Sequence, residues 1–100
     1  MAQTYIVECY CPGVTEDAVA ESAARAGAAA LDLQAQGSVI EFLGSVLVPA
    51  DEVTFWRFAS DTRHAVEEAS ARAGLAYDRV VECVEVPAEA RRQDLRGDDP

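Results

Sequence analysis

Charged side chains within otherwise apolar stretches are the residues of this sequence best placed to do chemistry. They are Glu8, Glu41, Arg57 and Glu82. If Glu8, Glu82 and Arg57 converge in a closed interior, burial raises the pKa of a carboxylate while the arginine lowers it, and one group can be tuned for proton transfer. The alternative is a structural ion pair, because ion-pair networks shift pKa values without any catalytic role.

Aromatic side chains in the same stretches predict an apolar pocket for a small molecule, since such sites are mostly hydrophobic with a few placed polar groups. The expected ligand contacts combine both kinds of residue. They are Glu8, Tyr10, Phe42, Trp56, Arg57 and Glu82, and Phe58 is a further candidate for the lining. In a catalytic version of the pocket, Glu8 or Glu82 is the base and Tyr10 the acid. Ordinary core packing is the other interpretation of these aromatics.

Three cysteines offer a second kind of site. Cys9 and Cys11 are two residues apart, hence on one side of a strand, and an antiparallel neighbour can bring Cys83 near them. Their thiolates would then hold a soft metal. Structural metal sites more often use turn-borne spacings such as C-x-x-C, and a buried free cysteine behaves as a small hydrophobe. Core packing is therefore the competing interpretation.

The elements that must position these residues follow from turn and periodicity signals. Strand-like runs cover residues 5–10, 39–48, 53–58 and 79–86. Helices are expected to begin after Thr15 and after Asp61, with Gly37 and Gly74 at their ends. The order β-α-β-β-α-β predicts a ferredoxin-like α+β domain over residues 1–87, with a four-stranded antiparallel sheet and both helices on one face. Residues 88–100 are polar and are expected to form a mobile tail.

The strands are apolar on both side-chain parities, which predicts that both faces of the sheet are covered. Residues 39–48 carry Phe42 on one parity and Leu43 on the other, and residues 53–58 carry Phe55 and Trp56 in the same way. The helices cover one face, and a second copy of the chain is the simplest cover for the other, closing a dimeric α+β barrel. Such a barrel has room for packed side chains or one small ligand. An aspartate at Trp56 or Phe58, whichever faces the second sheet, should break the dimer.

Composition and charge exclude several classes of function. The chain has 18 acidic and 8 basic residues and a formal charge of −10, which repels phosphate backbones and anionic membrane surfaces. No nucleic-acid or membrane partner is expected. The first residues lack the features of a secretory signal, so we expect a cytoplasmic protein. His64 is the only histidine, and neither a Ser/His/Asp arrangement nor a Gly-rich phosphate loop is present.

From Tyr5 to Val86 the chain resembles a family of small, largely uncharacterised ferredoxin-like proteins that form dimeric α+β barrels, some of them described as nickel-binding. The resemblance rests on Tyr5-Ile6-Val7-Glu8 ending at Pro12-Gly13, on Ser45, and on Ala73-Gly74-Leu75 followed by Asp78-Arg79-Val80 and Glu82. It implies the barrel, the homodimer and a divalent metal such as nickel. Gly44 and Ala69 stand where such relatives often carry histidines, the ligands that nickel favours. A metal here would need a different set of ligands.

The sequence therefore leads to a homodimeric barrel that binds a small ligand or a divalent metal. A cofactor-free isomerase, cyclase or monooxygenase acting on a small organic substrate is the first alternative. A structural module whose barrel is filled by its own side chains is the second.

Overall fold

The computed structural model describes residues 2–88, which form four strands and two helices in the predicted order. The elements are β1 (Gln3–Tyr10), α1 (Glu16–Ala35), β2 (Ile40–Val48), β3 (Val53–Ser60), α2 (Arg63–Arg72) and β4 (Arg79–Cys83). All but the first residue of the predicted tail, 88–100, lies outside the described residues.

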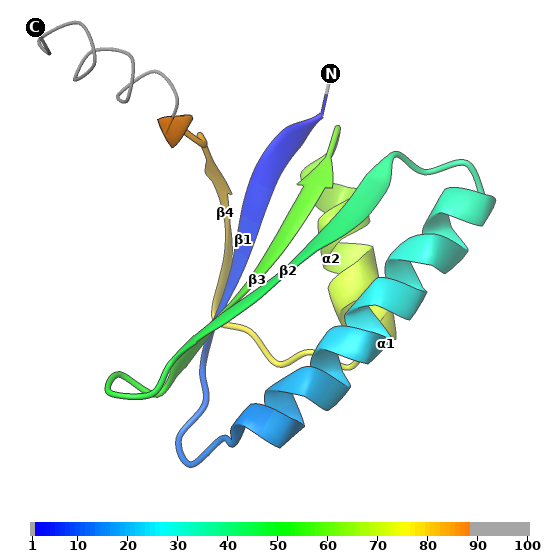
Figure 1. Cartoon of the computed structure of the whole chain (residues 1–100). Helices are drawn as coiled ribbons and strands as arrows, with labels where there is room; N and C mark the ends of the chain where they lie inside the picture. Colours follow the sequence, from blue (N-terminus) through cyan, green and yellow to red (C-terminus); the bar gives the residue numbers. More distant parts are fainter. Residues whose placement is uncertain (1, 89–100) are drawn as a thin grey trace, which may run out of the picture.

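The strands form one antiparallel sheet in the order β2-β3-β1-β4. Both helices lie on the same side of it, to the right in Figure 1. The predicted ferredoxin-like α+β fold is thereby confirmed. Neither helix is long and apolar enough to cross a membrane.

Side-chain caps set where the helices begin, and a glycine sets where α2 ends. The Thr15 hydroxyl accepts a hydrogen bond from the Ala18 backbone N–H at 3.1 Å, as predicted for α1. In α2 the cap is Thr62, whose hydroxyl accepts from the Ala65 N–H at 3.2 Å, so the prediction of Asp61 as the cap is wrong by one residue. Gly74 ends α2 with a φ of 69°, a left-handed conformation that glycine adopts without steric cost.

The core lies between the helices and one face of the sheet. The apolar stripe of α1 buries Val19, Ala26 and Leu33 against strand residues such as Val7 and Phe58, and the last two are fully buried. Burying a side chain of this size contributes about 2 kcal/mol. The alanines of α1 keep this helix close to the sheet.

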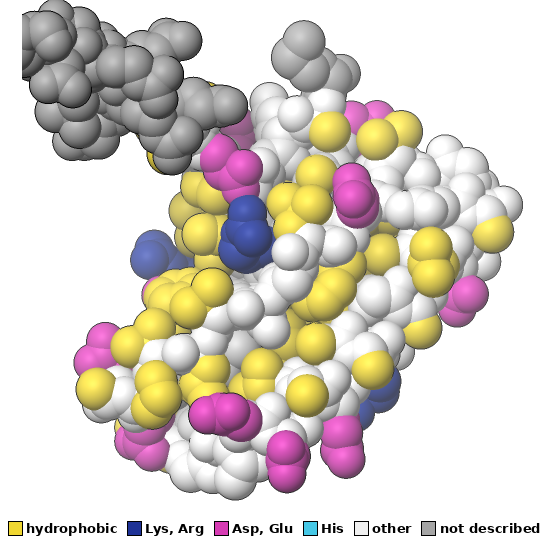
Figure 2. Space-filling view, viewed as in Figure 1, with side chains coloured by type: hydrophobic (Ala, Val, Ile, Leu, Met, Phe, Trp, Pro, Cys, Tyr) yellow, Lys and Arg dark blue, Asp and Glu magenta, His cyan; other side chains and the backbone are white. Residues whose placement is uncertain are grey.

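The other face of the sheet carries no helix or strand from the part of the chain that the structure describes. We call it the open face. Along β3, and from Thr4 to Tyr10 in β1, buried residues alternate with exposed or partly exposed ones, which separates the helix-covered side chains from those of the open face. The open face comprises Thr4, Ile6, Glu8 and Tyr10 of β1, Val53, Phe55, Arg57 and Ala59 of β3, Glu41, Gly44, Val46 and Val48 of β2, and Arg79, Val81 and Cys83 of β4. Figure 2 shows apolar side chains gathered over the strands, with basic and acidic side chains among and around them.

Candidate functional site

The open face brings together two of the three charges that the sequence singled out. Glu8 lies opposite Phe55 on one side and Arg79 on the other, and the Arg79 Nε donates to the Glu8 carboxylate at 2.5 Å. Arg57 lies opposite Ile6 on β1, and its guanidinium donates to Glu85, beyond the end of β4, at 2.5 Å. Glu8 and Arg57 therefore share a surface, and each is paired within the chain.

Glu82 does not join them, so the convergence of the three charges that the sequence left open does not occur within one chain. Glu82 lies opposite Tyr5, whose side chain faces the helices, whereas Glu8 lies opposite Arg79. Because side chains alternate along a strand, Glu82 projects from the other face of the sheet. Its side chain is exposed at that edge. A joint site with Glu8 is therefore geometrically excluded within one chain.

The predicted aromatic pocket is also divided between the two faces. Trp56 and Phe58 are buried under the helices, with 4% and 0% of their surface exposed, and Phe42 packs on Phe58 with ring centroids 5.2 Å apart. Tyr10 lies on the open face and is 58% exposed. Neither Trp56 nor Phe58 faces a second sheet, so the aspartate test must move to an open-face residue such as Phe55.

The three cysteines do not meet. Cys9 is buried on the helix side, Cys11 follows the end of β1, and Cys83 lies opposite Thr4, at the other end of β1. In residues 2–88, no three His, Cys, Asp or Glu side chains come close enough to hold a metal ion. The residues of one chain therefore do not fit the divalent metal, such as nickel, that the resemblance implies.

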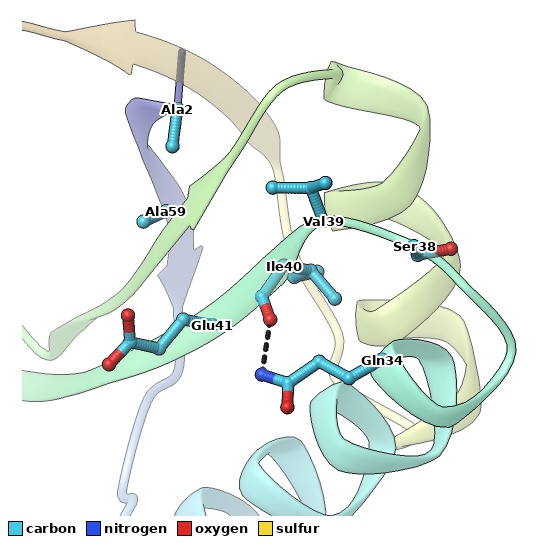
Figure 3. A pocket seen from close by; sticks show the side chains of 7 residues that line it. All are labelled: Ala2, Gln34, Ser38, Val39, Ile40, Glu41 and Ala59. Carbon is cyan, nitrogen blue, oxygen red and sulfur yellow. Dashed lines mark hydrogen bonds between the residues drawn. The ribbon is translucent and has the colours of Figure 1, made fainter.

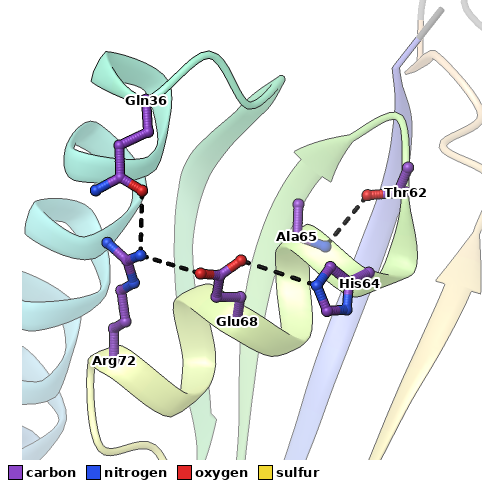
Figure 4. A network of polar contacts seen from close by, with 6 residues as sticks. All are labelled: Gln36, Thr62, His64, Ala65, Glu68 and Arg72. Atoms are coloured by element: carbon purple, nitrogen blue, oxygen red, sulfur yellow. Dashed lines mark hydrogen bonds and ion pairs between the residues drawn. The ribbon is translucent and has the colours of Figure 1, made fainter.

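His64 belongs to a surface network on α2. Its Nε2 lies 3.9 Å from a carboxylate oxygen of Glu68, and Arg72 donates to Glu68 at 3.0 Å and to Gln36 at 3.1 Å (Figure 4). These exposed contacts link α2 to the end of α1. Isolated surface pairs contribute about 0 to 1 kcal/mol, so we interpret the network as structural.

Two hollows flank β2 and are poor in free polar groups. The first, of about 280 Å³, lies where α1 meets the start of β2 (Figure 3). There the Gln34 amide donates to the Ile40 carbonyl, and Glu41 points to the other side of β2. The second, of about 500 Å³, is a groove between α1 and β2 lined mainly by alanines, Leu31 and Phe42. Neither groups several unpaired polar atoms.

A third hollow, of about 200 Å³, is lined by residues with unpaired polar atoms, and it was not predicted from the sequence. It lies between the start of α1, the α2–β4 loop, the last residues of β1 and the first half of β3. We call it the thiol cleft. Its lining is Cys9, Cys11, Val14, Ala18, Val19, Ser22, Thr54, Trp56, Gly74, Leu75 and Ala76. The Thr54 hydroxyl and the Trp56 indole nitrogen are buried, and neither has a hydrogen-bond partner among the described residues.

Burial raises the pKa of Cys9 in this cleft to about 12, with further contributions from Cys11, through a side-chain hydrogen bond and its charge, and from Asp78. The thiol of Cys9 is therefore neutral at physiological pH. The only sequence signal for the cleft was Thr54, a polar residue at a helix-facing position of an apolar strand. That position becomes recognisable only once the face of each strand is known.

Comparison with known proteins supports the fold. No family model matches the sequence, and no curated protein matches it significantly. The chain is similar to the crystal structure of SCO4226 from Streptomyces coelicolor A3(2), with a TM-score of 0.64 and 19% sequence identity over 84% of this chain and 99% of that chain. At this identity the likeness shows the fold alone. Nickel binding, dimerisation and cytoplasmic localisation stay predictions.

Proposed function

We propose that the protein is a homodimeric binding protein in which two open faces close a barrel around a small organic carboxylate. The observation that carries the proposal is the open face itself. It is a mainly apolar sheet surface with Arg57 on an inner strand and the Glu8–Arg79 pair beside it, and nothing in residues 2–88 covers it.

The need for a second copy follows from exposed apolar surface. Val46 is 50% exposed on β2 and lies opposite Phe55 on β3, while Ile6 on β1 lies opposite Val81 on β4. Ile6, Phe55 and Val81 are only partly buried. Contiguous exposed apolar patches on small proteins mark interaction sites. In a two-fold dimer, the open face of each copy covers the open face of the other, so both apolar surfaces are buried together.

The ligand class follows from Arg57 and its surroundings. Arg57 lies opposite Gly44, and a Cβ placed on Gly44 would meet nothing within 4 Å, so there is open space on the β2 side of Arg57. Arginine presents a planar set of donors that matches a carboxylate. Its present partner, Glu85, is part of a pair whose side chains are 36% and 55% exposed, and such pairs are weak enough to exchange for a ligand.

Residues 2–88 of one chain hold no group of three donor side chains, so a metal would need ligands from both copies, whereas Arg57 alone offers paired donors to an organic carboxylate. Catalysis has less support than binding. Of the two predicted bases, Glu82 lies on the other face, and Glu8 is held by Arg79. Glu8 and Tyr10 do share the open face, but Tyr10 projects at its rim and is largely exposed.

Native mass spectrometry of untagged protein, purified without chelator, tests the proposal. We expect a dimer carrying an organic mass that is absent after denaturation. Arg57→Gln should keep the dimer and lose that mass. Arg72→Gln is the matched control, because Arg72 is also 36% exposed and ion-paired but lies on α2. A monomer, an empty dimer, or a dimer whose only extra mass is a metal ion would contradict the proposal.

A further inference from the structure

The thiol cleft lies on the helix side of the sheet, so it is separate from the open face and from anything a dimer would enclose. Trp56 and Thr54 belong to the helix-covered side of β3, whereas Arg57 and Phe55 point the other way. We infer that the thiol cleft is a binding site for an uncharged small molecule that carries a hydrogen-bond acceptor, such as a carbonyl group.

The unpaired polar atoms in the cleft wall supply the first argument. Thr54 is fully buried and Trp56 is 4% exposed, and neither the hydroxyl nor the indole N–H has a partner in the described structure. Buried polar groups are almost always hydrogen-bonded, and an unsatisfied one costs about 1 to 3 kcal/mol. The indole nitrogen is only a donor. Both atoms lie beneath the surface of the cleft, so an acceptor reaches them once the lining side chains shift, and it would then relieve this cost.

The absence of charge in the lining supplies the second argument. Of the residues that line the cleft, none is Asp, Glu, Lys, Arg or His, and Cys9 is kept as a neutral thiol. Two carboxylates next to the cleft loops are bound to backbone N–H groups. Asp78 accepts from the Tyr10 N–H at 2.7 Å, and Glu52 accepts from the Gly13 N–H at 2.8 Å. The neighbouring cation is engaged as well, since Arg25 donates to the Ser22 hydroxyl at 3.0 Å and to the Ala73 carbonyl at 2.9 Å. An ionic ligand would therefore lose its hydration without gaining a counter-charge from the lining itself.

Size and rigidity complete the argument. An apolar cavity of about 150 Å³ is enough to bind benzene, and the cleft measures about 200 Å³. A single ring with one carbonyl group therefore fits. The hydrogen bonds of Asp78 and Glu52, together with the bond from the Cys11 N–H to the Glu52 carbonyl at 2.7 Å, fasten the loops around the cleft.

The sole tryptophan of the chain is Trp56, so the ¹⁵N-labelled protein has a single indole N–H signal that reports on the cleft. We propose to titrate it with acetophenone, a neutral ketone, and in parallel with toluene and with benzoate. The indole signal should move downfield and saturate with acetophenone. Toluene should bind less tightly because it offers no acceptor, and benzoate should leave the signal in place because it is charged.

Two pairs of variants keep the inference falsifiable. Thr54→Val removes the hydroxyl at nearly constant shape and should weaken acetophenone binding about two- to tenfold, whereas Thr4→Val, on the open face, should leave it unchanged. Ala18→Leu places bulk at the cleft lining and should block binding, whereas Ala20→Leu, at an exposed position of α1 outside the lining, should not. An unmoved indole signal, equal binding of toluene or benzoate, or unchanged affinity in Thr54→Val would overturn the inference.

Discussion

Phe55→Asp is the sharpest probe of the dimer, because Phe55 lies near the middle of the open face. In the strand register it stands between Glu8 on β1 and Val46 on β2, and its side chain is only partly buried in one chain. The substitution removes an aromatic ring from the proposed interface and adds a carboxylate there. It leaves the helix-covered core untouched, since Phe55 points away from it.

The expected effect is large because a two-fold interface contains each residue twice. Removing the burial of an aromatic side chain costs about 2 kcal/mol, and an unpaired buried carboxylate adds to this. Two copies give at least about 4 kcal/mol. At about 1.4 kcal/mol per factor of ten, the dimer dissociation constant should rise about a thousandfold.

Sedimentation velocity over a range of concentrations measures this constant directly. Leu31→Asp is the matched control, because Leu31 is 64% exposed on α1 and the change adds the same charge on the helix side. We expect Phe55→Asp to be a folded monomer with the circular dichroism of the parent protein, and Leu31→Asp to remain a dimer. If Phe55→Asp dimerises as tightly as the parent, the two sheets do not face each other and the barrel proposal is refuted.

Two further predictions concern the single chain. Thr62→Ala should lower the free energy of unfolding in urea by about 1 kcal/mol because it removes the α2 cap, while Asp61→Ala should change it little; equal losses would mean that the cap is misassigned. Iodoacetamide labelling of Cys9 in the native protein should be negligible at pH 8 and should rise about tenfold per pH unit up to pH 12, because its folded pKa is raised to about 12 and only the thiolate reacts. Peptide mass spectrometry gives the rate for each cysteine, and a Cys9 rate that levels off near pH 9 would contradict the raised pKa.

The fold was predictable from sequence because its signals are local. The Thr15 cap, the glycine at the end of α2 and the apolar stripe of α1 each depend on spacings of a few residues. Their order along the chain then limits the topology to very few arrangements. Boundaries were less accurate, and β4 ends at Cys83 although the prediction extended to Val86.

The candidate site was harder to predict because it depends on which way each strand faces. In β3 the buried face carries Trp56 and Phe58 but also Thr54 and Ser60, both fully buried, while the open face carries Phe55 and Arg57. Hydrophobicity therefore does not tell which alternate residues of β3 face the helices and which face the open side. Register adds a second unknown, since a shift of one residue reverses every side chain.

The register also decides which of the side-chain arrangements left open by the sequence occur. It places Arg79 and not Glu82 opposite Glu8, and it carries Cys83 to the far end of β1 from Cys9. The thiol cleft was beyond sequence reasoning for a different reason. Its walls come from two loops, a helix and two strands, drawn from three separate stretches of the chain, and the unpaired state of Thr54 is visible only when all of them are in place.

The two backbone contacts of Asp78 have a consequence for how the sheet opens locally. Asp78 donates its N–H to the Glu8 carbonyl at 2.7 Å and accepts from the Tyr10 N–H, so the residue just before β4 is bound twice to β1. The last strand residue, Cys83, is followed by the exposed Val84. β4 is a five-residue edge strand, and it should therefore fray from Cys83 toward Asp78. Such fraying would transiently expose the part of β1 that lies opposite Cys83, while the other end of β1, beside the thiol cleft, stays paired.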